Sequence, residues 1–342
     1  MKKLLVGALM LAGFLAGQAH AGQLSRQVFD SPALNGQIPA MVYVPEGPAP
    51  AAGWPVLYLL HGHDGNERSW TDLGHIQTTL DGLIARGEIA KLMVVMPGGG
   101  NGWYVDSEDV GGPGDFETAI TRDLVRAIEA AYPVRRDRGG RSIAGLSMGG
   151  FGALRLALGH PERYVSVASL SGAIWQNIPA EEFGATPERI AEFERAEYFH
   201  RVDPQTVTVG RILPSVISHF GGAFGRPFDP RRFNQQNIFT LLEKQRQAGA
   251  TLPAMYITCG DDDSLNLWQG AISFYNTAKA DRIKDVQLRI TDGGHVWSLW
   301  AAEIVDVLHF VDGKWTTPPA KPVMEPAPPM AERDQPRRSS PL

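Results

Sequence analysis

The sequence predicts an α/β domain in which helices cover both faces of a mostly parallel central sheet. Residues 55–60 (PVLYLL) and 92–96 (LMVVM) are continuous apolar runs, as expected of strands that are buried on both faces. Runs of this kind alternate with helical patterns along the chain, which implies parallel strands connected by helices. The chain has 342 residues, of which 43% are hydrophobic, so there is ample material for a buried core.

The strands and helices follow one another in a regular order. Residues 41–44 end at Pro45 and follow a turn-rich segment, so we expect an opening antiparallel pair. Residues 116–132 form a predicted helix, because apolar side chains recur there at every fourth position. The remaining predicted elements are strands at 142–146, 165–170, 254–259 and 286–290 and helices at 151–158 and 297–311.

Residues 174–249 interrupt this alternation, since they contain no convincing strand. They contain helical patches at 187–194 and 237–248, separated by joints rich in glycine and proline. We expect an insertion over the carboxyl edge of the sheet, where a cap would lie. A separate second domain is the alternative, but the segment lacks an obvious apolar core of its own.

The first 21 residues have the pattern of a secretory signal peptide. Two lysines precede an apolar run at residues 4–15, and Ala19-His20-Ala21 is a small-x-small site for signal peptidase. We expect cleavage after Ala21, so that the mature chain begins at Gly22 and is secreted or periplasmic. An uncleaved anchor is the alternative, but the apolar run is short for a membrane span, and no other segment is long enough.

Composition limits the remaining possibilities. Residues 316–342 are dense in Pro, Arg, Glu and Ser, so we expect a disordered tail after a domain spanning residues 22–315. The formal net charge is −5 and no run of Lys and Arg is present, so nucleic acid is not an expected partner. Cys259 is the only cysteine, and we expect a buried structural thiol. The oligomeric state is left open.

The most specific chemical signal is Gly145-Leu146-Ser147-Met148-Gly149. A serine on a sharp strand-to-helix turn flanked by glycines is the nucleophile elbow of the α/β-hydrolase fold. Here a predicted strand precedes Ser147 and a predicted helix follows it. The alternative is a tight structural turn with an idle serine.

A serine nucleophile needs a base and an acid, which follow it in the chain in this fold. His295 lies in a glycine-rich loop between a strand and a helix, whereas His309 lies within a helix. We therefore expect His295 to be the base. Asp261, Asp262 and Asp263 directly follow a strand, and spacing alone does not choose the acid among them.

Backbone N–H groups must stabilise the oxyanion that forms on the substrate. One is expected from Met148, the residue after the nucleophile, and the other from His63 in the loop that follows residues 55–60. An alternative interpretation takes His61, His63 and Asp64 as zinc ligands. The hydrolase interpretation gives the same loop a role, so we expect neither a metal nor a cofactor.

Four aromatic side chains are candidates for the walls of a substrate cleft. They are Trp103, Tyr104, Trp297 and Trp300. An aryl or sugar group would pack well against such rings. Core packing is an equally good interpretation for each of them.

Taken together, these motifs resemble the Putative esterase family, which includes esterase D, feruloyl and acetyl xylan esterases and the mycolyltransferase antigens. The resemblance spans about residues 45–300. It is carried by His61-Gly62, Trp70, Trp103-Tyr104-Val105-Asp106, Phe116-Glu117-Thr118, the elbow with Gly150, Cys259-Gly260-x-x-Asp263 and Gly293-Gly294-His295-x-Trp297-x-x-Trp300. The family pattern selects Asp263 as the acid and supports the His63 and Met148 amides as the oxyanion hole.

The resemblance implies a serine esterase that cleaves a small-molecule or carbohydrate ester, and the predicted signal peptide implies that this esterase is secreted. The long insertion lies where substrate would be selected, so the family says little about which ester is cut. The predicted signal peptide argues against a cytosolic role in formaldehyde detoxification. An acyltransferase to a sugar or lipid alcohol would use the same Ser147, Asp263 and His295. A non-catalytic binding protein is a further alternative, against which the intact set of three residues argues.

Overall fold

The computed structural model describes residues 22–193 and 219–316. The predicted signal peptide (1–21) and the predicted tail after Thr316 lie outside the described residues, as does part of the insertion. No helix in the described part of the chain is long and apolar enough to span a membrane.

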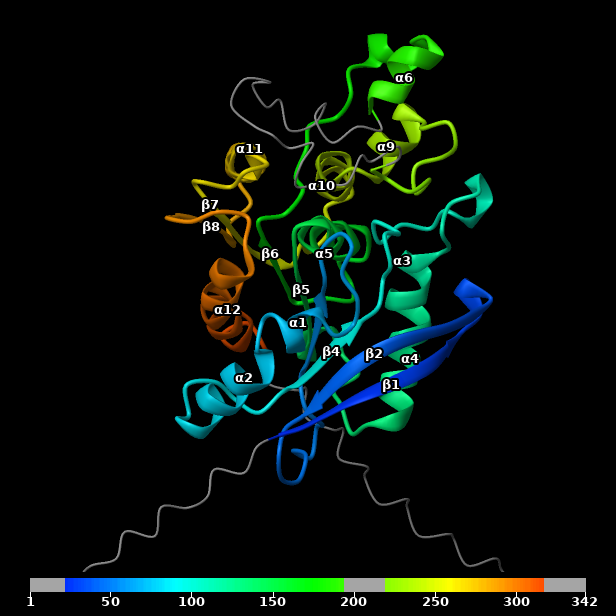
Figure 1. Ribbon diagram of the computed structural model, residues 1–342. Coiled ribbons are helices and arrows are strands. Elements are labelled where there is room, and N and C mark those ends of the chain that lie inside the picture. The colour runs from blue at the N-terminus through cyan, green and yellow to red at the C-terminus, as the bar shows by residue number, and fades with distance from the viewer. Residues whose placement is uncertain (1–21, 194–218, 317–342) are drawn as a thin grey trace, which may run out of the picture.

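The described residues form one eight-stranded sheet in the order β1-β2-β4-β3-β5-β6-β7-β8 (Figure 1). β1 pairs with β2 and β2 with β4 in antiparallel register, and all other neighbours are parallel. The strands are β1 (Gln23–Ser31), β2 (Gly36–Val44), β3 (Val56–Leu60), β4 (Met93–Pro97), β5 (Arg141–Leu146), β6 (Ser166–Leu170), β7 (Ala254–Gly260) and β8 (Val286–Thr291). The predicted opening pair and mostly parallel sheet are confirmed.

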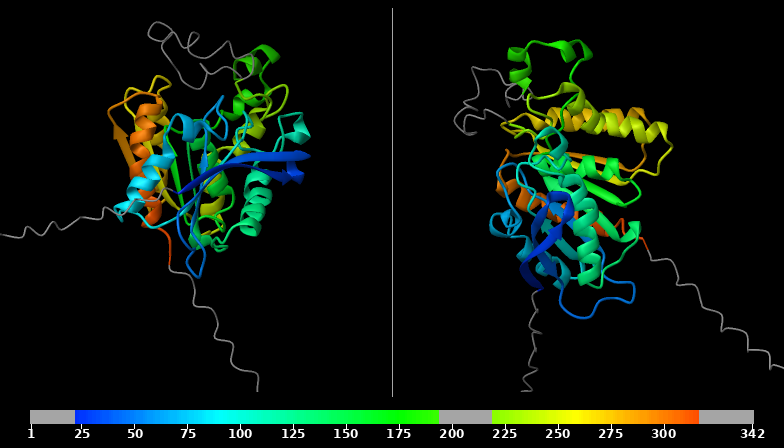
Figure 2. Two further views of the ribbon diagram at one scale, coloured as in Figure 1. Left: turned by 60° about the horizontal axis from the view of Figure 1, so that its bottom comes forward. Right: turned by 90° about the vertical axis from the view of Figure 1, so that its right-hand side faces the viewer.

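Both faces of the sheet are covered, as the continuous apolar runs predicted. In β3, Val56, Tyr58 and Leu60 belong to one buried cluster, and Leu57 and Leu59 belong to the cluster on the opposite face. Figure 1 shows helices on both sides of the sheet, and the turned views of Figure 2 show the same layering. On the first face lie α4 (Val125–Ala131), α5 (Met148–Gly159), α10 (Ile238–Gln247) and α11 (Leu267–Ala280); on the second lie α2 (Ile76–Ala85) and α12 (Trp297–Asp312).

The predicted helix at 116–132 is present with a local change of winding. It begins as α3 (Phe116–Thr118), passes through a π-helical segment over Ala119–Leu124, and continues as α4. The helix ends at Ala131, and Tyr132 has extended backbone (φ −130°, ψ 150°), because Pro133 disfavours helical backbone in the residue before it.

The described parts of the insertion pack onto the main domain. They contain a 3₁₀ turn at Ala180–Gly184, α6 (Pro187–Phe193), α9 (Pro230–Gln236) and α10. The side chain of Asn237 accepts a hydrogen bond from the Phe239 N–H and so caps α10. The buried phenylalanines of the insertion belong to the same cluster as one face of the sheet: Phe193, Phe220, Phe224, Phe228 and Phe233.

The described chain ends against the amino-terminal edge of the parallel strands. Trp315 Nε1 donates to Ser142 Oγ (3.0 Å) at the start of β5, and Thr316 N donates to the Gly139 carbonyl (3.2 Å). The guanidinium of Arg135 donates to the Thr316 carbonyl (2.5 Å). Ser142 and Ser147 lie at opposite ends of one strand, so this anchor is remote from the serine turn.

Candidate active site

Ser147 lies on a strained turn between β5 and α5. Its backbone has φ 53° and ψ −120°, a region that costs a non-glycine residue on the order of 1–3 kcal/mol. The glycines of the motif allow the crossing chains to approach. A Cβ at Gly145 would lie 2.3 Å from the Gly149 oxygen, and one at Gly149 would lie 2.5 Å from the His61 oxygen. The turn thus holds the serine at the carboxyl edge of the sheet.

His295 connects Ser147 to Asp263. Its Nε2 lies 3.0 Å from Ser147 Oγ, and its Nδ1 lies 2.7 Å from Asp263 Oδ2. Because a carboxylate only accepts, Nδ1 carries the proton, and Nε2 is left to accept from the serine hydroxyl. The three residues follow β5, β7 and β8, whose carboxyl ends meet at one edge of the sheet.

The Asp263 carboxylate is buried, and each of its two oxygens accepts a hydrogen bond. Its side chain has no exposed surface, and its Oδ1 accepts from the Leu265 N–H (2.9 Å). Burial alone would raise the pKa of Asp263. The hydrogen bond and charge of His295, with the N–H groups of Leu265 and Leu267, outweigh burial and lower the pKa below its ordinary value. Asp263 therefore stays ionised and can stabilise a charged imidazole.

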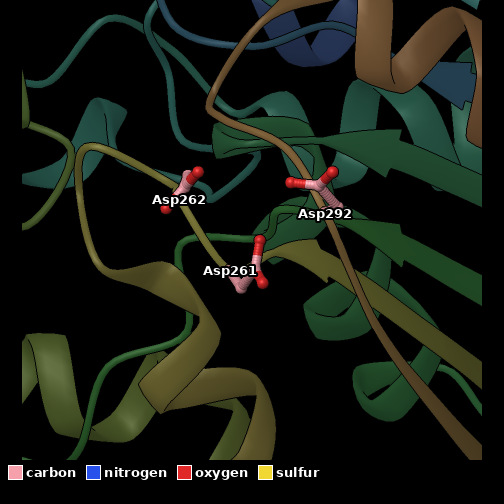
Figure 3. A group of neighbouring side chains, drawn as sticks. All are labelled: Asp261, Asp262 and Asp292. Atoms are coloured by element: carbon pink, nitrogen blue, oxygen red, sulfur yellow. The ribbon is translucent and has the colours of Figure 1, made fainter.

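The two neighbouring aspartates lie elsewhere. Asp261 and Asp262 are exposed and gather with Asp292, with one carboxylate oxygen of each within 4.8 Å of the others (Figure 3). Asp261 Oδ1 also accepts from the Gly293 N–H (3.2 Å). Carboxylate oxygens are ligands for hard cations, but exposed acidic groups of this kind are common without an ion. We assign this cluster no function.

His61 has a structural environment that does not fit the zinc alternative. It is buried, and its Nε2 accepts from the Gly99 N–H (2.9 Å), so its proton resides on Nδ1, 2.7 Å from the Gly62 carbonyl. Burial is the main cause of the lowered pKa of His61, which keeps the ring neutral. Both ring nitrogens are occupied, and within residues 22–193 and 219–316 His61, His63 and Asp64 do not form a metal-binding group.

The loop that carries His63 packs directly against the nucleophile turn. A Cβ at Gly62 would lie 3.3 Å from Ser147 Cβ. The His63 ring stacks on His219 with centroids 5.3 Å apart, and its Nε2 donates to the His219 carbonyl (3.2 Å). Met148 is the first residue of α5, and the first N–H groups of a helix have no partner within the helix. Both predicted oxyanion donors thus border the serine turn.

A cavity of about 450 Å³ opens over Ser147 and His295. Most of its wall is apolar: Trp103, Trp175, Trp297, Trp300, Leu73, Leu265, Leu267 and Val296. Leu73 and Val296 are about half exposed, at 52% and 48%. They form an apolar rim at the cavity mouth.

The four predicted aromatic residues have different positions. Trp103, Trp297 and Trp300 line the cavity, and the Trp300 ring lies edge-on to His295 at 4.8 Å. Tyr104 does not line it. Tyr104 is fully buried and its hydroxyl donates to the His61 carbonyl (2.8 Å), so this residue supports the loop below the site. The expectation that Tyr104 contacts substrate is therefore corrected.

Sequence reasoning missed several residues of the cavity wall, and two of them carry aromatic rings, Trp175 and His219. Trp175 lies five residues after β6, and His219 comes from the insertion. The Trp103 Nε1 donates to the His219 carbonyl (3.1 Å), which joins the insertion to the loop after β4. The position of Trp175 after a predicted strand was a usable signal, but nothing in the sequence distinguished His219.

A second cavity of about 680 Å³ adjoins the first. Trp175, Leu265 and Leu267 line both cavities. The rest of its wall is more polar and includes Gln176, Asn177, Gln269 and Ser273. The site therefore combines an aromatic chamber at the serine with an amide-rich one beside it.

Comparison with known proteins identifies the family. Residues 31–311 match the family model described as Putative esterase. The chain is 28% identical over 255 residues to an acetyl esterase of Caldicellulosiruptor saccharolyticus, covering 75% of this chain and 82% of that protein. It is 32% identical over 160 residues to an endo-1,4-beta-xylanase/feruloyl esterase of Xylanibacter ruminicola, covering 45% of this chain and only 22% of that protein.

Solved structures agree on the fold. A ferulic acid esterase superposes with a TM-score of 0.61 at 24% identity, covering 86% of this chain and 99% of that one. This likeness supports the α/β-hydrolase architecture, and the family match spans nearly the whole described domain. The chain therefore belongs to the Putative esterase family and is a carboxylic-ester hydrolase.

Proposed function

We propose that this protein is an exported serine esterase in which Ser147, His295 and Asp263 form the catalytic triad. The observation that carries the proposal is the continuous hydrogen-bonded line from Ser147 Oγ through His295 to the buried Asp263 carboxylate. Its geometry is that of a nucleophile, a general base and the acid that orients the base.

The first half of the proposed reaction forms an acyl-enzyme. Ser147 Oγ attacks the ester carbonyl carbon while His295 Nε2 takes the serine proton. Asp263 stabilises the resulting imidazolium, and the N–H groups of His63 and Met148 stabilise the oxyanion. The tetrahedral intermediate then expels the alcohol, which leaves with the proton held by His295.

The second half releases the acid. A water molecule gives a proton to His295 and attacks the acyl carbon. Collapse of the second tetrahedral intermediate breaks the bond to Ser147 Oγ, which recovers its proton from His295. No step requires a metal or a cofactor.

The cavities favour an ester between an aryl or short acyl group and a sugar. The indole rings of Trp103 and Trp297 in the cavity wall suit an aromatic or small apolar acyl group in the chamber next to Ser147. The adjoining chamber presents the amides of Gln176, Asn177 and Gln269, which suit sugar hydroxyls. The relatives named acetyl esterase and feruloyl esterase agree with this substrate class.

Export follows from the proposed signal peptide. The lysines and the short apolar run of residues 1–21, ending in Ala19-His20-Ala21, support secretion or delivery to the periplasm. An esterase in that location would act on substrates outside the cytoplasm.

The test is hydrolysis of p-nitrophenyl acetate and an aryl ester by the wild type, Ser147→Ala and Ser298→Ala, each with and without a chelator. Ser298 is an exposed serine on α12 and serves as the matched control. We expect Ser147→Ala to lose activity by at least about 10⁴-fold, with no effect of the control substitution or the chelator. Full activity in Ser147→Ala would refute the triad.

A second measurement keeps the result interpretable if these model esters are poor substrates. A fluorophosphonate should phosphonylate Ser147 in the wild type, with fluoride as the leaving group, and should not label Ser147→Ala. Product analysis with added sugar or lipid alcohols then separates the hydrolase from the acyltransferase. Acyl transfer that outpaces hydrolysis would replace the hydrolase proposal.

A further inference from the structure

Gly22 occupies a specific site at the amino-terminal edge of the sheet. Its backbone N donates to Asp81 Oδ1 (2.8 Å), and its carbonyl accepts from Gln77 Nε2 (2.9 Å). Both partners belong to α2, and Gly22 itself is buried. The residue directly before β1 is therefore fixed by side chains from a helix more than fifty positions further along the chain.

Asp81 receives a second donor at the same oxygen. The hydroxyl of Tyr43, on β2, donates to Asp81 Oδ1 (2.7 Å). Burial, followed by the hydrogen bond and charge of Asp81, raises the pKa of Tyr43, so the phenol keeps its proton and remains a donor. Two donors converging on one half-buried carboxylate oxygen form a site suited to a positive charge.

The site also fits glycine closely. A Cβ at Gly22 would lie 2.4 Å from Tyr43 Cζ and 2.5 Å from its hydroxyl oxygen. Any other side chain would displace the tyrosine ring or the start of β1. This glycine directly follows the proposed signal-peptidase site Ala19-His20-Ala21.

We infer that hydrolysis of the Ala21–Gly22 bond during export creates an α-ammonium group that forms an ion pair with Asp81. Water adds across the peptide bond, which leaves a carboxylate on Ala21 and an amine on Gly22 that takes up a proton at neutral pH. The amide of the precursor offers one donor and no charge, whereas the ammonium offers three donors and a full charge. The inference rests on the export part of the proposed function and is independent of ester hydrolysis.

After the signal peptide is removed, the ion pair would hold the first residue of the mature chain in place. Among the described residues, β1 is an edge strand of the sheet and its partner is β2. An ion pair from Gly22 to α2 would hold the first residue of that edge against the domain. Processing would thus stabilise the mature enzyme as well as release it.

The first test identifies the new terminus and compares the rate at which its α-amine is labelled in four proteins. Sequencing of the exported protein should give Gly22 as the first residue. The α-amine is then labelled with an amine-reactive reagent at one neutral pH in wild type, Asp81→Asn, Tyr43→Phe and the control Asp285→Asn. Only the neutral amine reacts, so raising its pKa by one unit slows labelling by about tenfold.

The ion pair predicts a different labelling rate for only one of the variants. Asp81→Asn should label about tenfold faster than wild type. Tyr43→Phe keeps the ring against Gly22 and keeps the carboxylate, so it should remain slow, as should Asp285→Asn, whose carboxylate pairs with Lys314 instead. A different first residue, or equal rates in wild type and Asp81→Asn, would overturn the inference.

A stability measurement tests the same pair without relying on the reactivity of the amine. The mature chain is compared with a chain whose Gly22 amine is acetylated, in the wild-type and Asp81→Asn backgrounds. Acetylation should lower Tm by about 2 °C in the wild type and leave Asp81→Asn unchanged. An equal change in both backgrounds would show that the charge of the terminus does not act through Asp81.

Discussion

The carboxylate of Glu117, on α3, accepts a hydrogen bond of 2.5 Å from the guanidinium of Arg155, on the helix that begins directly after Ser147. Arg155 is buried, with 3% of its side chain exposed, and it also donates to the Tyr104 carbonyl (3.0 Å). His160 Nε2 lies 2.7 Å from the second Glu117 oxygen. Arg155 thus connects the nucleophile helix to the loop that carries Trp103, and Glu117 pairs with its buried charge.

Glu117→Gln should destabilise the protein by about 3 kcal/mol, because it leaves the buried Arg155 without its carboxylate. The change should appear as a lower midpoint of urea unfolding with an unchanged slope. Glu162→Gln is the matched control. Glu162 is 67% exposed and its 3.4 Å contact with Arg163 lies at the surface, so its loss should matter little. Equal effects of the two substitutions would contradict the role given to Glu117.

The same group predicts loss of stability in acid. Burial raises the pKa of Glu117, but the charge of Arg155 and the hydrogen bond from His160 outweigh it and lower the pKa from 4.5 to about 2. A lowered folded-state pKa stabilises the protein above the unfolded pKa, and this contribution disappears as pH falls through the folded one. At about 1.4 kcal/mol per pKa unit, about 3 kcal/mol should be lost between pH 4.5 and about 2.

The measurement is the free energy of unfolding of wild type and Glu117→Gln as a function of pH. Above about pH 5 the difference between them should be constant, and it should shrink as pH falls toward about 2. A difference that stays constant throughout this range would show that ionised Glu117 is not the source of the stability.

Asp263→Asn should lower kcat for ester hydrolysis by about 10⁴-fold while the protein stays folded. An amide in place of the carboxylate can donate to Nδ1 and so favours the wrong tautomer of His295, besides removing the charge that stabilises its imidazolium. Asp262→Asn is the control, since Asp262 is adjacent in the chain but exposed. A large loss in Asp262→Asn, or none in Asp263→Asn, would reassign the acid.

Trp297→Ala should reduce kcat/KM for an aryl ester about tenfold more than for an acetyl ester, because an aromatic acyl group would lose a ring to pack against. Trp297 is partly exposed, and its ring meets Trp70 edge-on at 5.4 Å. Parallel kinetics with p-nitrophenyl acetate and an aromatic acyl ester check this selectivity. The same loss for both esters would place Trp297 in support of the loop rather than in contact with substrate.

Most of the fold could be predicted because the central strands are buried on both faces. A strand such as β4 must be apolar at every position, which gives a run that is visible without any other information. α11 was missed although its buried positions Leu267, Ala271, Phe274 and Ala278 recur at helical spacing. Two of the four are alanines, which contribute little to an apolar pattern.

The candidate site could be predicted in part because its chemistry follows chain order. Ser147 and His295 were selected by motif and loop context, while Asp263 needed the family pattern. Tyr104 shows the limit of this reasoning. An aromatic residue that follows a cavity tryptophan in the chain can itself point into the core. For Tyr104, the hydrogen bond from its hydroxyl to the His61 carbonyl shows this orientation, and the sequence alone does not. His219 reaches the cavity through the fold of the insertion, which no local signal encodes.

The hydrogen bonds of Trp315 and Thr316 place the end of the described chain on the side of the domain that is opposite the cavity. Ser142, which receives Trp315, and Ser147 lie at the two ends of β5, about 17 Å apart at strand spacing. Gly22 lies near the same end as Ser142, because β1 begins opposite the last residue of β2. A carrier, bead or cell surface joined directly at Thr316 would therefore lie at the edge of the sheet opposite the cavity mouth, and the cavity would stay open to a bulky polymeric substrate.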